Sequence, residues 1–138
     1  MPKLPTQTAT LLTAALAAHP KPSPLKPPPS AQDTTVVNLI ELEIDPLQLD
    51  AYKAALTEEI EISVRVEPGV LTLYAVAVKD HPTEIRLFET YTSPAAYQAH
   101  LDSPQYKQYK AATQGMITSR KLLETVPVIL GGKHPLTP

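Results

Sequence analysis

The 138-residue chain contains no cysteine and no tryptophan, and it has one phenylalanine and four glycines. Without cysteine it has no disulfide framework, no thiolate nucleophile and no cysteine-ligated zinc or iron–sulfur site. The four histidines lie far apart and never at the i,i+4 spacing of a zinc-binding helix. A metal site would therefore have to be assembled entirely by the fold.

The net charge is also small, because 12 basic and 14 acidic residues nearly cancel to give −2. This balance provides no basic patch of the kind that neutralises phosphates, so we expect no nucleic-acid partner. No apolar run approaches the ~20 residues that a bilayer-spanning helix needs, so we expect no membrane partner either.

Proline, in contrast, is abundant, and eight of its 16 occurrences fall in the first 30 residues. Segment 21–30 is typical of an extended polyproline linker, and the run 9–18 predicts a short helix before it. We therefore expect an arm at 1–33, a folded domain at 34–131 and a tail at 132–138. We expect a cytoplasmic protein, with secretion through the weakly signal-like run 9–18 as the minor alternative.

Within the domain, the pattern predicts strands at 34–44, 70–80, 83–91 and 120–130. Asp45-Pro46 opens a helix whose apolar stripe is Leu49, Tyr52, Leu56, Ile60 and Val64, and two Ser-Pro pairs, at 93–94 and 103–104, open two further helical segments. The short turn at His81-Pro82 predicts an antiparallel hairpin.

This order, β-α-β-β-α-β, predicts a ferredoxin-like α+β fold with an antiparallel sheet. If the sheet curls, we expect a small cavity on its face away from the helices. An exposed edge strand is usually covered, so we also expect a homodimer.

One segment carries a specific pattern, E-x-[aromatic]-x-S-x-x-A-[aromatic]-x-x-H-L. It is formed by Glu89, Tyr91, Ser93, Ala96, Tyr97, His100 and Leu101. With VEPGVLTLYAVAVKD before it and a closing strand after it, the chain over about 35–130 resembles the antibiotic biosynthesis monooxygenase family of dimeric α+β barrels, including its small quinol monooxygenases. The resemblance implies that the sheet curls into a dimeric barrel.

The resemblance further implies a cofactor-free oxygenation of a small aromatic or quinol substrate, with molecular oxygen as co-substrate. A phenol or quinol loses a proton, its anion reduces oxygen, and the radical pair recombines to give a quinone. Such chemistry needs a dry apolar cavity, a base and hydrogen-bond donors. Related haem degraders carry an iron-ligating histidine where this chain has Lys110 and a tryptophan where it has Tyr91, so haem is disfavoured.

His100 is the best candidate for the base or substrate anchor, because it shares one helix face with Tyr97. It can equally be a structural histidine bonded to Glu89 or to a backbone carbonyl. Asn38 interrupts an apolar strand face, so it either meets a ligand or another buried polar group, and the resemblance implies a catalytic role.

Tyr91 is the third predicted catalytic residue, and Tyr74, Tyr97 and Arg86 are the predicted substrate contacts. Core packing alone would also explain Tyr74 and Tyr91, and a solvated or dimer-bridging role is the favoured alternative for Arg86.

The sequence thus favours a cofactor-independent monooxygenase. An isomerase or lyase using the same cavity, and a non-catalytic barrel that binds a small molecule, remain as alternatives.

Overall fold

The computed structural model describes residues 34–133 of the chain. The expected N-terminal helix and proline-rich linker, and residues 134–138 of the tail, lie outside the described residues. In chain order the elements are β1 (Val36–Ile44), the 3-10 turn η2 (Pro46–Gln48), α1 (Leu49–Val66), β2 (Val70–Val78), β3 (His81–Tyr91), α2 (Pro94–Asp102), α3 (Pro104–Thr113) and β4 (Ile117–Thr125).

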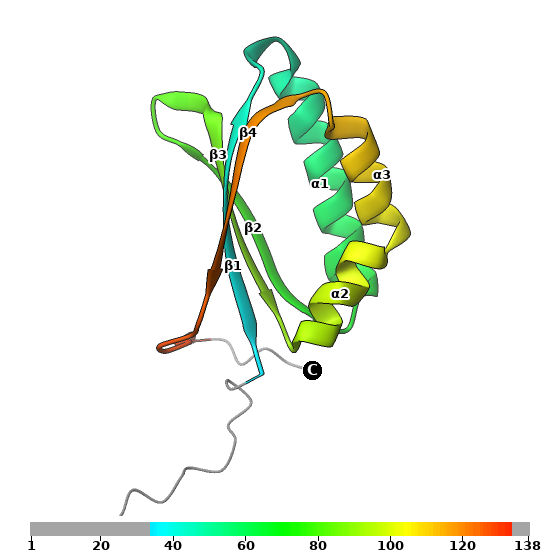
Figure 1. The fold of residues 1–138 in the computed structure, drawn as a ribbon, viewed down its shortest axis with the longest axis vertical. Helices are drawn as coiled ribbons and strands as arrows, with labels where there is room; N and C mark the ends of the chain where they lie inside the picture. The colour runs from blue at the N-terminus through cyan, green and yellow to red at the C-terminus, as the bar shows by residue number, and fades with distance from the viewer. Residues whose placement is uncertain (1–33, 134–138) are drawn as a thin grey trace, which may run out of the picture.

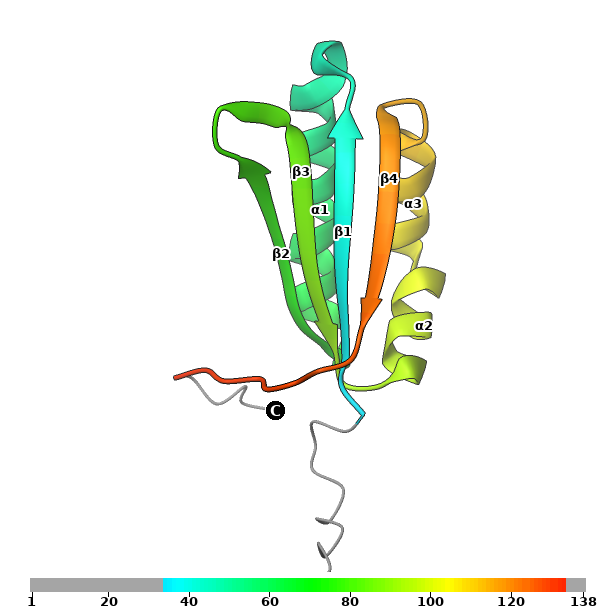
Figure 2. The same cartoon turned by 60° about the vertical axis from the view of Figure 1, so that its left-hand side comes forward.

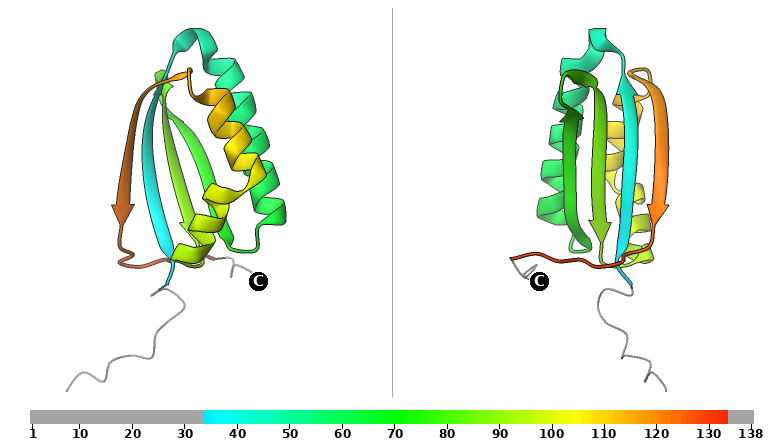
Figure 3. Two further views of the ribbon diagram at one scale, coloured as in Figure 1. Left: turned by 45° about the vertical axis from the view of Figure 1, so that its right-hand side comes forward. Right: turned by 90° about the vertical axis from the view of Figure 1, so that its left-hand side faces the viewer.

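The strands form one antiparallel sheet in the order β2-β3-β1-β4. Helices α1, α2 and α3 all lie on one face of this sheet, as Figures 1 and 2 show. The predicted ferredoxin-like α+β fold is therefore confirmed. The opposite face of the sheet is not covered by any element of residues 34–133 (Figure 3, right).

Side-chain caps start the helical segments where the sequence predicted them. The Asp45 carboxylate accepts a hydrogen bond from the Leu47 amide at 3.0 Å, and the chain passes through η2 before α1. Ser93 accepts from the Ala96 amide at 3.1 Å, and Ser103 accepts from the Tyr106 amide at 3.3 Å. The proline that follows each cap has no amide to satisfy, so it fits the first turn.

Several strand boundaries differ from the prediction: β1 begins at Val36 instead of 34, and β4 begins at Ile117 instead of 120. β4 ends at Thr125 instead of continuing to 130, because its partner β1 begins at Val36 and offers no backbone beyond that point. The hairpin between β2 and β3 turns at 79–80, and His81 already belongs to β3. Asp80 takes the left-handed conformation, with φ at 66°, which aspartate tolerates better than most residues.

The core lies between the sheet and α1. Its buried members are Ile40, Leu42, Ile44, Tyr52, Leu56, Ile85 and Leu87. The predicted stripe of α1 is wrong at Val64, which is 53% exposed, while Glu59 and Ser63 are buried on the helix. A carboxylate and a hydroxyl thus occupy positions where the periodicity called for apolar side chains.

Gly69 allows β2 to begin close beneath α2. A Cβ atom at this position would collide with the side chain of Ala96 on α2. The EPG turn at 67–69 brings Glu67 into contact with α2 and α3.

Candidate active site

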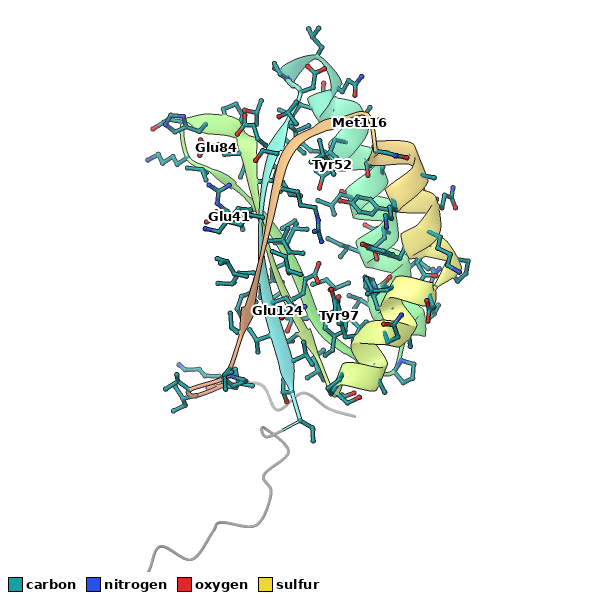
Figure 4. All side chains as sticks on the ribbon, viewed as in Figure 1. Glu41, Tyr52, Glu84, Tyr97, Met116 and Glu124 are labelled. Atoms are coloured by element: carbon teal, nitrogen blue, oxygen red, sulfur yellow. The ribbon has the colours of Figure 1, made fainter. Side chains whose placement is uncertain are left out.

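A cavity of about 690 Å³ lies between the sheet and the helices. It lies on the helix-covered face, not on the opposite face where it was predicted. The cause is visible in the packing: α3 rests on α1, and the inner side of β4 presents Arg120, Leu122 and Glu124 instead of a continuous apolar row. Figure 4 shows Tyr97 between the sheet and the helices, with Glu41 and Glu84 on the other side of the sheet.

α2 places His100 at the cavity wall, where only 2% of the residue is exposed. Its Nδ1 lies 2.8 Å from Oε2 of Glu67, and Gln105 Nε2 donates to the same oxygen at 2.9 Å. A carboxylate oxygen accepts hydrogen bonds and an imidazole N–H donates them, so this contact orients the His100 imidazole. The other ring nitrogen, Nε2, lies 3.4 Å from Oε1 of Glu59.

These side chains close into a ring. Gln105 donates to the Ser63 hydroxyl at 3.1 Å, and Ser63 donates to Glu59 Oε1 at 2.7 Å. The ring thus comprises residues of α1, of the EPG turn, of α2 and of α3, in the order His100, Glu67, Gln105, Ser63, Glu59. We refer to it below as the His100 ring.

The His100 ring can hold one exchangeable proton. Nε2 of His100 and Oε1 of Glu59 lie 3.4 Å apart, so the two groups can share one proton. Burial raises the pKa of Glu59, against the lowering effects of the Ser63 hydrogen bond and of His100. Both residues line the cavity.

A second carboxylate, Glu89 of β3, also lines the cavity. Burial raises its pKa, while a hydrogen bond from Tyr91 and the positive fields of His100 and Arg120 oppose the rise. The Tyr91 hydroxyl donates to Glu89 Oε2 at 2.9 Å. Tyr91 is fully buried and is not among the residues that line the cavity. Its hydrogen bond holds the Glu89 carboxylate in place.

A series of neighbouring aromatic rings begins at Tyr91 and extends along the cavity. The centre of the Tyr91 aromatic ring lies 5.0 Å from that of Tyr97, and the centre of the His100 imidazole lies 5.1 Å from that of Tyr106. The Tyr106 ring centre is in turn 6.0 Å from that of Tyr109. Burial raises the pKa of Tyr97, Tyr106 and Tyr109, so their hydroxyls stay neutral. The cavity thus offers flat apolar surfaces with donor groups at their edges.

The structure brings some of the predicted site residues together and separates others. His100 and Tyr97 line the cavity. Asn38 is buried on the same face of the sheet, opposite Glu89 in register, and its Nδ2 has no hydrogen-bond partner among the described residues. It does not line the cavity.

Tyr74 and Arg86 have their side chains on the opposite face. Tyr74 is among the residues that line the cavity. It pairs in register with Phe88 on the outer face, however, and is 62% exposed. Arg86 contacts Glu41 at 3.9 Å and Glu84 at 3.7 Å on that outer face.

Sequence reasoning missed Glu67 and Gln105 as members of the His100 ring. It also missed six polar residues that line the cavity: Glu59, Tyr106, Lys107, Tyr109, Lys110 and Arg120. A signal existed for Glu59, because a carboxylate three residues after Leu56 falls on the apolar stripe of α1. Glu67 lies in a turn and has no periodic signal, so only the fold shows that it contacts His100.

Glu59, Glu67 and His100 converge, yet within residues 34–133 no group of three histidine or acidic side chains could hold a metal ion. Over the same residues, no helix is both long and apolar enough to cross a membrane.

Comparisons with known proteins give a consistent family. The model of the antibiotic biosynthesis monooxygenase family matches residues 35–112. A proposed antibiotic biosynthesis monooxygenase of Bacteroides thetaiotaomicron is 42% identical, with a TM-score of 0.72 over 77% of this chain and 100% of that one.

Two further solved structures are similar. A proposed monooxygenase of Lactobacillus acidophilus is 32% identical, with a TM-score of 0.66 over 71% of this chain and 46% of that one. A proposed antibiotic biosynthesis monooxygenase of Chloroflexus aurantiacus is 26% identical, with a TM-score of 0.63 over 75% of this chain and 100% of that one. No curated protein matches the chain. By the family match over more than half of its length, the chain belongs to the antibiotic biosynthesis monooxygenase family.

Proposed function

We propose that the protein is a cofactor-independent monooxygenase that oxidises a hydroxylated aromatic or quinol-type small molecule in the cavity. The observation that carries this proposal is the proton-holding pair His100 and Glu59 at the wall of a cavity rich in tyrosine rings. The family supports oxygenation as the reaction.

In this proposal His100 Nε2 takes the proton of the substrate hydroxyl. A positive charge formed on the imidazole lies between the carboxylates of Glu59 and Glu67, at 3.4 and 2.8 Å, and is stabilised by both. Glu67 and Gln105 act as positioning residues, because they hold the ring in the orientation that presents Nε2.

The substrate anion then reduces molecular oxygen by one electron. The resulting substrate radical and superoxide recombine into a carbon–oxygen bond, and the oxygen–oxygen bond breaks. One oxygen atom stays on the substrate as a carbonyl, and the other leaves as water with the two hydrogens that the substrate has lost. The hydroxyls of Tyr97 and Tyr106, kept neutral by burial, are placed to donate to the developing anion.

The same proposal includes a homodimer. The outer face of the sheet carries an apolar row of Tyr74, Phe88, Leu39 and Leu123, which are in register across β2, β3, β1 and β4. Beyond β4, Val126, Val128 and Ile129 are 86%, 98% and 78% exposed, and Figure 2 shows this segment crossing the end of the sheet. A second copy would bury both surfaces.

Oxygen uptake by the purified protein tests the oxygenase proposal, with an anthrone, a naphthol and a quinol as substrates and no flavin, haem or metal added. We expect uptake above the spontaneous rate, and a loss of about 10²–10⁴-fold in His100→Gln. This variant keeps a donor for Glu67 but removes the proton acceptor, and its melting temperature is measured beside it. His81→Gln, at an exposed site on β3, is the matched control.

Each contrary outcome identifies a different function. Uptake at the spontaneous rate over the whole set of substrates contradicts oxygenation. Product formed without oxygen would indicate an isomerase or lyase, and thermal stabilisation by a ligand without any product would indicate a binding barrel. Full activity in His100→Gln would remove His100 from the chemistry.

A further inference from the structure

Three basic side chains line the same cavity and are not members of the His100 ring. Lys107 and Lys110 come from α3, and Arg120 comes from β4. Among residues 34–133 none of the three has a carboxylate within the 4.0 Å of an ion pair; the ion pairs found there involve Arg86 and His100. Residues 31–138 carry nine basic against 14 acidic side chains, so a group of unpaired cations stands out.

Lys107 and Lys110 repel each other electrostatically. They lie three residues apart on α3, a spacing at which side chains are neighbours on one helix side and like charges repel. Both are exposed, so the cost is small. An anion between them would convert the repulsion into attraction.

Arg120 approaches from the opposite wall. It pairs in register with the core residue Leu42, so its side chain is on the helix-covered face. Burial raises the pKa of Tyr106, and the charge of Arg120 opposes the rise. Burial likewise raises the pKa of Tyr97, which Arg120 again opposes. The guanidinium therefore lies within electrostatic reach of the aromatic rings that the proposed substrate would contact.

We propose that Lys107, Lys110 and Arg120 form an anion-binding mouth that selects an aromatic substrate carrying a carboxylate. The inference rests on the proposed function for the hydroxyl that meets His100. It adds that the aromatic ring lies among the tyrosines of α2 and α3 and that the carboxylate lies between α3 and β4. The guanidinium can bind a carboxylate through two parallel hydrogen bonds, and the two ammonium groups add charge.

Two related probes test this: a naphthol and the hydroxynaphthoate that adds one carboxylate to the same ring system. Binding to the full chain is measured by calorimetry without oxygen, so no turnover is needed. We expect hydroxynaphthoate to bind at least tenfold more tightly than naphthol at low ionic strength, with the preference falling as salt is added.

Variants locate the effect. The triple variant Lys107→Gln, Lys110→Gln, Arg120→Gln is expected to remove the tenfold preference for hydroxynaphthoate over naphthol. A control triple variant, Lys53→Gln, Lys79→Gln, Lys121→Gln, makes the same change in net charge at exposed sites that do not line the cavity, and should keep the preference.

The inference is overturned if the two probes bind equally, if neither binds, or if the cavity triple variant keeps the preference. It is also overturned if that variant loses molar mass in light scattering without a change in preference, because the cations would then serve contact with a second copy. Oxygen uptake separates the two proposals. A carboxylate preference without uptake supports the mouth and contradicts the oxygenase, whereas uptake without preference does the reverse.

Discussion

The two faces of the sheet are built from alternate residues of the same strands, yet only one of them is covered by helices. On β1, Ile40 and Leu42 are 7% and 3% exposed because α1 covers them, whereas Leu39 on the outer face is 37% exposed. The inner face is completed by the chain itself. The outer face carries an apolar row, which the proposed second copy would cover.

Polar groups differ between the faces in the same way. In the helix layer that covers the inner face, the His100 ring links five side chains with little exposure to water. On the outer face Arg86 contacts Glu41 and Glu84 at 3.9 and 3.7 Å in side chains that are more than a third exposed. Water screens the outer contacts, so they contribute little to stability, whereas the inner contacts hold the His100 imidazole in one orientation.

The largest expected effect distinguishes the two faces by core packing. Leu42→Ala should reduce the free energy of unfolding by about 2–5 kcal/mol, because it leaves a cavity in a closed core. Leu39→Ala should cost about 1 kcal/mol or less in the separate protomer, and more as protein concentration rises. Urea unfolding at several protein concentrations measures both. Equal costs at all concentrations would contradict the comparison.

A smaller effect tests the outer face as an interface. Phe88→Asp places a charge in the centre of the apolar row, so we expect the dissociation constant of the dimer to rise at least tenfold. Sedimentation equilibrium measures the constant. Arg86→Gln, on the neighbouring position of the same strand face, is the control and should change the free energy of unfolding by about 0.5 kcal/mol or less. A monomeric wild type would refute the proposed dimer.

The smallest effect concerns pH and the inner face. Burial raises the pKa of Glu89 above its ordinary value, so the folded state favours the protonated form. The stability that this group contributes is fully present below its unfolded pKa and is lost as pH rises through its folded pKa. Tyr91, His100, Glu59 and Arg120 act on the same carboxyl and modify the range.

Glu89→Gln mimics the protonated form, so the melting temperature of this variant should fall less than that of the wild type between about pH 4.5 and neutrality. Glu84→Gln, with an exposed side chain on the outer face, should follow the wild type. Thermal unfolding across this pH range measures the difference. A steeper fall in Glu89→Gln than in the wild type would reverse the assigned direction.

Local patterns predicted most of the fold. The caps at Ser93 and Ser103, the hairpin of β2 and β3, and the alternation of β1 follow from interactions within a few residues. The candidate site could be predicted only in part. His100 and Tyr97 share a helix face and therefore a cavity, but the contact of His100 with Glu67 joins residues 33 positions apart.

The sequence alone determined the order of elements, the helix starts, the family resemblance and the position of His100, because periodicity and capping depend on near neighbours. Only the tertiary structure decided the end of β4 and the helix-covered location of the cavity. It also decided the closure of the His100 ring and the approach of Arg120 to α3. These features depend on packing between distant segments of the chain and not on any local pattern.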